Sequence, residues 1–288
     1  MKFGIFANIK KAQVCERLPS ILKMLTDRDM DVIVSGQVAG EVNFSHSRME
    51  VADLADIPRR ADMIVSMGGD GTMLAAARLV GEAEKPILGI NLGGLGFLTE
   101  ISADEIQAKM EKIIRGEYHI EKRMVIGAEV NGTPSRDYHC LNDMVIERGA
   151  SPRVIRVDVD IDGEYFNTYI ADGLILSTPT GSTAYSLSSW GPIVLPTLES
   201  IIINPICPHA LTVRPTLLPA TSTIVMKIET PDTNAILSVD GQYIVEIPSG
   251  TRITLRKASF YVHLVLLEEH SFFDRLRRKL QWGSLPRK

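Results

Sequence analysis

The sequence is poor in several features that mark special classes of protein. Only three cysteines occur in 288 residues, and they are scattered, so neither a disulfide framework nor a zinc site on paired cysteines is expected. No apolar run is long enough to cross a bilayer, and the one near the start is too short for a signal peptide core. The formal net charge of −4 gives no general attraction for nucleic acid or acidic membranes. We therefore expect a cytoplasmic protein that binds neither nucleic acid nor a membrane.

Several catalytic motifs are also absent. Neither the P-loop pattern G-x-x-x-x-G-K-[ST] nor the dinucleotide pattern G-x-G-x-x-G occurs, so any phosphate site must belong to another class. The sequence TGSTA lacks the G-x-S-x-G elbow, and no histidine is placed as its base, which disfavours a serine hydrolase.

The spacing of apolar residues changes near residue 122. Residues 1–122 alternate short apolar runs with helical ones, which is typical of an α/β layer domain with a mostly parallel sheet. Residues 123–260 alternate apolar and polar positions around turn pairs such as Asp162-Gly163. This second pattern predicts a mainly antiparallel β domain, in which residues 251–258 form one strand.

Residues 261–288 predict a closing strand over 261–269 and then a helix, and we expect this segment to return to the N-terminal domain. The helix has an apolar side and a basic side, and we expect the basic side to face solvent. The apolar residues are Phe272, Phe273, Leu276 and Leu280, and the basic ones are Arg275, Arg277, Arg278 and Lys279.

The segment SMGGDGTML, residues 66–74, places three glycines and one aspartate between an apolar run and a helix-forming run. Turns of this kind attract phosphate, because free backbone N–H groups and the helix dipole favour an anion. Asp70 would repel that anion unless a metal ion intervenes or the carboxylate removes a proton; the simpler alternative is that Asp70 or Thr72 caps the helix. A second glycine-rich turn, with Gly93, Gly94 and Gly96, follows the next predicted strand, so both turns could line one phosphate cleft.

Three further segments carry polar side chains beside apolar ones. Residues 171–194 are rich in serine and threonine, which can cradle sugars and phosphates or simply cap turns. Asn142 and Asp143 interrupt an apolar run, where polar side chains either cap a turn or face a site. The segment SVDGQ, residues 238–242, is by itself more typical of a hairpin turn than of a site.

Five segments together carry a resemblance to a known family. They are GGDGT (68–72), LGFLTE (95–100), LNDMV (141–145), DGLILSTPTGSTAYSLS (172–188) and VDGQ (239–242). In this order and spacing they resemble the bacterial NAD kinases over residues 1 to about 270. GGDGT is shared with diacylglycerol, sphingosine and phosphofructo-kinases, whereas the serine-rich segment with the Asn-acidic pair is far more specific.

The resemblance implies an enzyme that phosphorylates the 2′-hydroxyl of the adenosine ribose of NAD with ATP and Mg²⁺. Asp70 would receive the proton of that hydroxyl, and Gly68, Gly69 and Thr72 would hold phosphate. The metal ligands stay unassigned, and a homo-oligomer, either a dimer or a tetramer, is implied. The NAD-binding residues that it implies are Gly71, Phe97, Asn142, Asp143, Asp172, Thr183, Ala184, Tyr185, Ser188 and Gln242.

Within that set, Asn142 would contact the adenosine half, Asp143 the ribose hydroxyls and Asp172 the nicotinamide end. The sequence departs from the family pattern at Asp143, where glutamate is common, and at Ser189-Trp190, where Ala-Gly is expected.

Two other functions share part of this pattern. A lipid kinase of the diacylglycerol type shares GGDGT, although the hydroxyl-rich segment argues against a greasy acceptor pocket. A non-catalytic module that senses NAD or NADP would keep the pocket without turnover.

Overall fold

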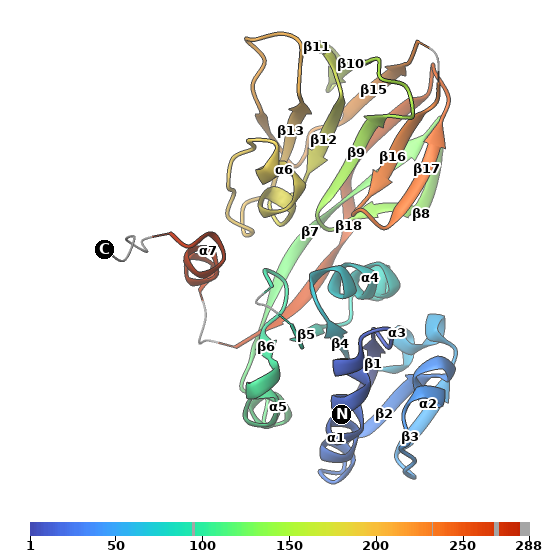
Figure 1. Cartoon of the computed structure of the whole chain (residues 1–288), viewed down its shortest axis with the longest axis vertical. Coiled ribbons are helices and arrows are strands. Elements are labelled where there is room, and N and C mark those ends of the chain that lie inside the picture. The colour runs from blue at the N-terminus through green and yellow to red at the C-terminus, as the bar shows by residue number, and fades with distance from the viewer. Residues whose placement is uncertain (94–95, 232, 268–270, 283–288) are drawn as a thin grey trace. The chain divides into compact units, whose positions relative to one another are not determined.

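The structure is a computed structural model that describes residues 1–93, 96–231, 233–267 and 271–282 (Figure 1). The chain divides into two compact units. Unit 1 comprises Met1–Lys122 and Val262–Lys288, and unit 2 comprises Arg123–Tyr261. The expected fold class is confirmed, because unit 1 is an α/β layer, unit 2 is mainly antiparallel β, and the C-terminal segment belongs to unit 1.

A parallel sheet with the strand order β5-β4-β1-β2-β3 forms the centre of unit 1. Strand β4 is buried along its whole length, as apolar strands of a helix-covered parallel sheet usually are. The strands are β1 (Lys2–Ala7), β2 (Asp31–Ser35), β3 (Met49–Ala52), β4 (Met63–Gly68), β5 (Ile87–Asn91) and β6 (Ile101–Ser102), which pairs with β5.

Several helices of unit 1 contribute apolar residues to the core around that sheet. In the first helix the buried residues include Val14, Leu18 and Leu22, which recur at helical spacing. The helices are α1 (Ala12–Thr26), α2 (Gly36–Glu41), α3 (Ile57–Arg60), α4 (Asp70–Val80), α5 (Ile106–Ile114) and α7 (Phe272–Leu280). The sequence did not predict α2, α3 or β3, because helices of six and four residues are too short to show a helical period and the strand MEVA is not an apolar run.

The strand order creates a switch point between β1 and β4. From β1 the chain moves outward to β2 and β3, and it then returns to the other side of β1 to form β4 and β5. In open α/β sheets, ligands bind outside the carboxyl ends of the strands at such a point. The carboxyl ends of β1 and β4 lie side by side here, since Ala7 pairs with Met67. This edge carries the Gly68-Gly69 turn.

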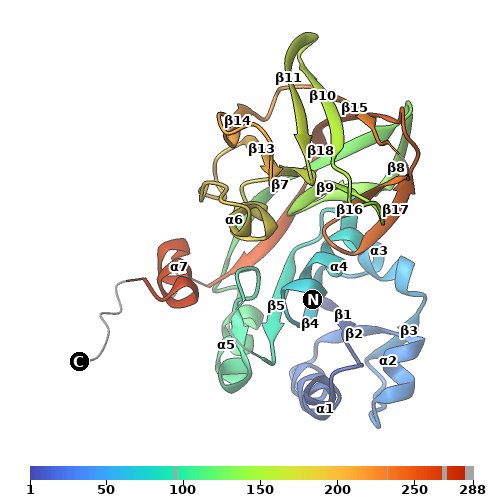
Figure 2. The same cartoon turned by 45° about the horizontal axis from the view of Figure 1, so that its top comes forward.

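Unit 2 contains two antiparallel layers around one core. One layer is a six-stranded sheet with the order β14-β13-β12-β9-β16-β17, and the other contains the pairs β11-β10, β10-β15, β15-β18 and β7-β8. The β10-β11 hairpin extends at the top of Figure 2. Apolar residues of both layers form one buried cluster.

The strands of unit 2 alternate buried and exposed positions where only one face is covered. Strand β16, for example, reads buried, half-buried, buried, half-buried, buried. The bounds are β7 (His119–Val130), β8 (Thr133–Cys140), β9 (Asp143–Arg148), β10 (Ile155–Ile161), β11 (Glu164–Ala171), β12 (Gly173–Ser177), β13 (Ser200–Ile206), β14 (Thr216–Pro219), β15 (Ile224–Glu229), β16 (Ala235–Val239), β17 (Tyr243–Ile247), β18 (Arg252–Leu266) and helix α6 (Tyr185–Ser188).

Strand β18 corrects one prediction. The sequence predicted separate strands over 251–258 and 261–269, but Arg252–Leu266 forms one strand of 15 residues. Its first part pairs with β15 in unit 2, and Leu264 pairs with Ile87 in unit 1. The run Ala258-Ser259-Phe260 interrupts the alternation of apolar and polar residues, so the sequence pattern did not predict one continuous strand. Residues 268 and 269 lie outside the described residues.

Helix α7 confirms a predicted helix but corrects the prediction of its faces. Arg275 does not face solvent: its side chain is 7% exposed and pairs with Glu100. Phe273, expected on the packed side, is 56% exposed. The buried positions are Arg275 and Leu276, so the helix packs on a face that combines one arginine with aliphatic groups. In the described part of the chain no helix is long and apolar enough to cross a membrane.

Candidate functional site

The turn from β4 into α4 is shaped by contacts that only glycine permits. A methyl group on Gly68 would lie 2.1 Å from the Thr72 hydroxyl, which accepts a hydrogen bond of 3.4 Å from the Gly69 N–H. Helix α4 begins directly at Asp70, with Gly69 as its extended N-cap. The side chain of Asp70 therefore emerges at the carboxyl edge of the parallel sheet, beside the switch point.

The carboxylate of Asp70 is held by the segment 96–100. Phe97 N–H donates to its Oδ2 at 2.9 Å, and Leu98 N–H donates to its Oδ1 at 3.1 Å. A methyl group on Gly96 would lie 2.1 Å from Asp70 Oδ1, so a larger residue would push this segment away. An ionised carboxylate can accept about four hydrogen bonds, so each oxygen keeps capacity for a further partner. The capping alternative holds for Thr72, whose hydroxyl accepts from the N-cap Gly69 N–H, but not for Asp70, whose side chain bonds a distant segment.

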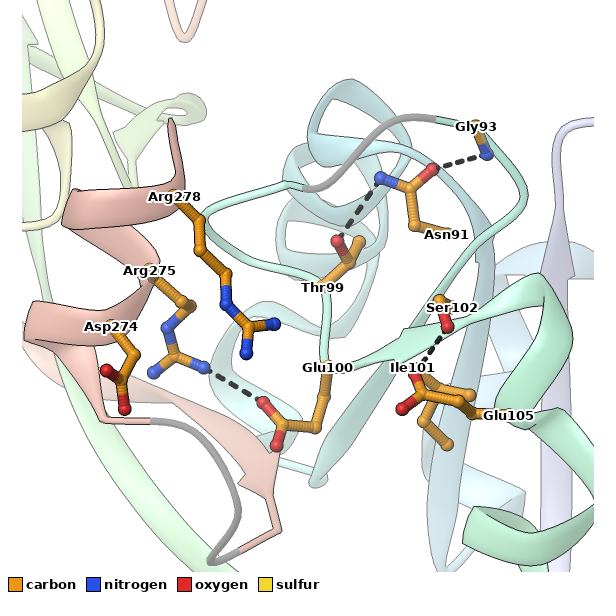
Figure 3. A pocket seen from close by; sticks show the side chains of 10 residues that line it. All are labelled: Asn91, Gly93, Thr99, Glu100, Ile101, Ser102, Glu105, Asp274, Arg275 and Arg278. Carbon is orange, nitrogen blue, oxygen red and sulfur yellow. Dashed lines mark hydrogen bonds and ion pairs between the residues drawn. The ribbon is translucent and has the colours of Figure 1, made fainter. Parts of the chain in front are cut away.

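A buried ion pair anchors the same segment to the C-terminal helix. Glu100 accepts from the Arg275 guanidinium at 2.9 Å (Figure 3). It also accepts from the Leu267 N–H at 3.0 Å. The Glu100 side chain is 1% exposed, and burial raises its pKa against the opposing effect of Arg275. Lys279, one turn further along α7, places its ammonium 5.5 Å from the centre of the Phe97 ring. The C-terminal helix thus fixes the segment that holds Asp70.

A cavity of about 270 Å³ opens beside this ion pair within unit 1. Figure 3 shows Arg275 and Arg278 reaching into it from α7, opposite Glu100. The second predicted glycine turn contributes Gly93 to the wall, whereas Gly94 lies outside the described residues. Asn91, at the end of β5, accepts from the Gly93 N–H at 2.9 Å.

Unit 2 contains a separate pocket of about 340 Å³. It brings together four residues predicted to bind the dinucleotide, which are Asn142, Asp143, Ala184 and Tyr185. Three carboxylates line the pocket, namely Asp143, Glu147 and Asp240. The Tyr185 hydroxyl donates to Glu147 at 2.9 Å.

Asp143 is the most strongly perturbed group of this pocket. Its side chain is buried, and Oδ2 has no hydrogen-bond partner. Burial, reinforced by the nearby Asp240 carboxylate, raises the pKa of Asp143 from 3.8 to about 7. A buried acceptor without a donor is costly in the free protein, and a ligand hydroxyl could supply the missing donor.

The sequence underestimated Asp240. It lies in the turn between β16 and β17, as the hairpin prediction required, but its carboxylate also accepts from three backbone N–H groups. The donors are Leu141, Asn142 and Asp143, at 3.0, 2.7 and 3.1 Å. Asp240 therefore shapes the turn that presents the Asn-Asp pair. The sequence contained only the VDGQ segment as a signal. That segment predicts a turn but does not predict that Asp240 accepts hydrogen bonds from a distant part of the chain.

The hydroxyl-rich segment uses many of its hydroxyl groups internally. Thr178 donates to the Leu141 carbonyl at 2.5 Å, and Ser182 donates to the Pro179 carbonyl at 2.7 Å. A methyl group on Gly181 would lie 2.1 Å from the Asn142 carbonyl oxygen, which explains a glycine at that crossing. These contacts match the capping alternative for the buried hydroxyls. Ala184 and Tyr185 at the end of the segment face the pocket instead.

Four predicted dinucleotide residues of unit 2 do not line this pocket. Asp172 pairs with Arg148 at 2.9 Å, and Thr183 donates to the Thr180 carbonyl at 3.3 Å. Ser188 and Gln242 are exposed. In unit 1, Gly71 is exposed in the first turn of α4, and Phe97 is half-buried beside Asp70.

The unusual Trp190 lies on the surface, 93% exposed. Its φ of 63° belongs to the left-handed region that favours glycine, which accounts for the glycine expected at this position. The indole ring therefore leaves the local packing undisturbed at the expense of backbone strain.

Comparisons with known proteins match both halves of the chain. A family model described as the ATP-NAD kinase N-terminal domain matches residues 3–118, and one described as the C-terminal domain matches residues 141–267. The NAD kinases of Geotalea daltonii and Geobacter sulfurreducens are 39% and 41% identical to this chain, and each match covers 98% of this chain and 99% of the relative.

Two solved structures are also similar over almost the whole chain. The yeast NADH kinase complexed with NADH has a TM-score of 0.90 and 30% identity, covering 100% of this chain and 89% of its own. The NAD kinase from Archaeoglobus fulgidus in complex with ATP has a TM-score of 0.76 and 26% identity, covering 98% and 99% respectively.

Proposed function

Because the chain belongs to the NAD kinase family, we propose that it transfers the γ-phosphoryl group of ATP to the 2′-hydroxyl of the adenosine ribose of NAD, which yields NADP and ADP. The family resemblance predicted from the five segments is thereby confirmed. The observation that carries the proposal is the Asp70 carboxylate, held by two backbone N–H groups at the carboxyl edge of a parallel sheet.

In the proposed reaction the ribose oxygen attacks the γ-phosphorus and the bond from that phosphorus to the β,γ-bridging oxygen breaks. ADP leaves with the electron pair, and Asp70 receives the hydroxyl proton. Phosphoryl transfer depends mainly on positioning and on charge stabilisation, so a carboxylate with fixed orientation and spare acceptor capacity suits this role. Gly68, Gly69 and Thr72 would hold phosphate through the start of α4.

We assign dinucleotide contacts in each unit by itself. In unit 1, Gly71 and Phe97 would contact NAD next to Asp70. In unit 2, Asn142 would contact the adenosine half, and Asp143 would accept from ribose hydroxyls. The unpartnered buried oxygen of Asp143 supports this assignment, since a ligand donor would remove an unsatisfied acceptor. The remaining proposed contacts are Asp172, Thr183, Ala184, Tyr185, Ser188 and Gln242.

We further propose that a divalent cation, Mg²⁺, enters together with ATP. Among the described residues no group of three or more His, Cys, Asp or Glu could hold a metal ion. Mg²⁺ in kinases is usually bound by one or two carboxylates and the substrate phosphates, and the spare acceptor capacity of Asp70 fits such a donor set. When bound, the ion would neutralise charge on the phosphate oxygens. A cytoplasmic location and a homo-oligomer, either a dimer or a tetramer, complete the proposal.

The test is to incubate the purified protein with NAD, ATP and Mg²⁺ and to measure NADP by an NADP-specific dehydrogenase. We expect NADP to accumulate only when all three are present. Folded protein that binds NAD without forming NADP would refute the proposed activity and favour the sensing module.

A further inference from the structure

The turn after β1 holds a lysine at the switch point of the unit 1 sheet. Strand β1 ends at Ala7, and the Asn8 N–H donates to the Met67 carbonyl at 3.0 Å, which ties this turn to the end of β4. The Lys11 N–H then donates to the Asn8 carbonyl at 3.1 Å, and Lys11 is the N-cap of α1. The backbone of Lys11 is therefore fixed beside the Gly68-Gly69 turn.

The Lys11 side chain extends over that turn. A methyl group on Gly69 would lie 3.6 Å from the Lys11 ammonium and 4.0 Å from the Asn91 side-chain oxygen. Lys11 is exposed, and its ammonium has no ion pair or hydrogen bond among the described residues. An ammonium over a glycine turn that makes no ion pair among the described residues is available to an anionic ligand.

Charge balance favours a fixed protein cation there, in addition to the Mg²⁺ that we propose enters with ATP. A donor triphosphate approaching this edge meets the Asp70 carboxylate, which repels it. Backbone N–H groups at the start of α4 supply partial charges only. A lysine ammonium is a compact full charge with several donors, suited to a phosphoryl group whose negative charge is spread over its outer oxygens.

We propose that Lys11 is a catalytic residue that binds the γ-phosphoryl group of the donor at the Gly68-Gly69 turn. This inference rests on the proposed kinase function. Lys11 forms no covalent bond and donates hydrogen bonds to the oxygens of the transferring group. It acts on the donor side of the reaction, whereas the Asn142 pocket of unit 2 belongs to the acceptor.

The experiment compares Lys11→Ala and Lys11→Met with Lys11→Arg and with a matched control, Lys10→Ala. Lys10 is the exposed neighbour in the same turn. We expect Lys11→Ala and Lys11→Met to lower kcat/KM for ATP roughly 100- to 1,000-fold, as loss of a preorganised charge donor does. Lys11→Arg should recover most of that loss, since the charge stays. Lys10→Ala should remain within about twofold of the parent, and NAD affinity by calorimetry should not change in any variant.

Binding of inorganic tripolyphosphate, measured by calorimetry without NAD or Mg²⁺, separates this inference from the proposed function. We expect the parent protein to bind it and Lys11→Ala to bind at least roughly tenfold more weakly. If the parent forms no NADP but tripolyphosphate binding still depends on Lys11, the proposed kinase fails and the anion site stands.

Two outcomes would overturn the role of Lys11. One is Lys11→Ala protein, folded by circular dichroism, that keeps parental ATP kinetics and tripolyphosphate affinity. The other is a loss of equal size in Lys10→Ala, which would indicate a general effect of surface charge.

Discussion

Asp70 of unit 1 and Asp143 of unit 2 each lie in a candidate site, and their two carboxylates are held in opposite ways. Asp70 accepts from two backbone N–H groups, one on each oxygen. Asp143 is buried next to Asp240, and one of its oxygens has no partner at all. The first arrangement fixes the orientation of a charged group, whereas the second makes the charged group unfavourable.

From this difference we infer two uses of a carboxylate in the proposed reaction. A carboxylate whose orientation is fixed in advance can act in the transition state without rearrangement. A buried carboxylate with one unpartnered oxygen destabilises the free protein and gains a donor when a ligand hydroxyl arrives, so it would contribute to binding. Substitutions at the two positions should therefore differ in which quantity they change.

The largest expected effect is that of Asp70→Asn. The amide keeps the size of the side chain but accepts no proton, so we expect kcat to fall roughly 10²- to 10⁴-fold with NAD affinity nearly unchanged. Steady-state kinetics and calorimetry measure the two quantities, and Asp104→Asn, an exposed aspartate of unit 1, is the control. An Asp70→Asn variant that loses NAD affinity while it keeps its turnover would contradict a role of Asp70 in the transition state.

The next effect concerns the ion pair that anchors the segment 96–100. Glu100→Gln leaves the buried Arg275 charge without its counter-charge, so we expect the free energy of unfolding to fall by about 3–5 kcal/mol. Glu117→Gln is the matched control, because the Arg115–Glu117 pair is exposed and should contribute less than about 1 kcal/mol. Urea unfolding measures both, and equal losses in the two variants would contradict an anchoring role.

Asp143→Asn, in contrast to Glu100→Gln, should raise the free energy of unfolding. The folded-state pKa of about 7 lies above the ordinary 3.8, so the folded state binds the proton more tightly than the unfolded state. Stability from this group is present below about pH 4 and is lost as the pH rises towards 7. At pH 8 we expect the Asp143→Asn variant to gain roughly 1–4 kcal/mol, with no gain at pH 4.

Thermal unfolding of the Asp143→Asn variant and of the parent between about pH 4 and pH 8 measures this difference in stability. NAD affinity of the variant should fall at the same time. A gain that does not depend on pH would show that the buried charge is not its source.

The smallest effect expected is that of Gly96→Ala. Its new methyl group would displace the segment from Asp70, so we expect kcat to fall roughly 10- to 100-fold while the fold persists. Gly40→Ala, where a methyl group meets nothing within 4 Å, is the control and should leave kcat unchanged. Unchanged kinetics in the Gly96 variant would show that the amides of Phe97 and Leu98 do not set the position of Asp70.

The sequence predicted the features that depend on local patterns. The period of the apolar residues was enough for the parallel sheet with its main helices and for the antiparallel unit, and the segment at Asp70 was correctly placed between β4 and α4. Helix α7 was predicted as an element, but Arg275 was assigned to the wrong face. A basic residue in an amphipathic helix is expected to face solvent unless its partner is known, and Glu100 lies 175 positions away.

Long-range contacts account for the other misses. The Asp240 carboxylate clamps amides 97 to 99 positions earlier in the chain, which no local pattern encodes. The role that we propose for Lys11 likewise depends on β1 and β4 being neighbours in the sheet, since nothing in the segment around Lys11 points to Gly69. The spacing of apolar residues predicts where helices and strands lie in the sequence. Which polar and charged groups come into contact depends on how the strands pair.

The central claim is that phosphate passes from ATP to a ribose hydroxyl of NAD under the control of Asp70. Phosphorus-31 NMR of a reaction with NAD, ATP and Mg²⁺ tests it most directly. We expect one new phosphomonoester signal, that of a 2′-phosphorylated dinucleotide, to grow in step with ADP, and to be almost abolished in Asp70→Asn protein. Formation of ADP with inorganic phosphate and no phosphorylated dinucleotide, or equal product from the variant, would contradict the account.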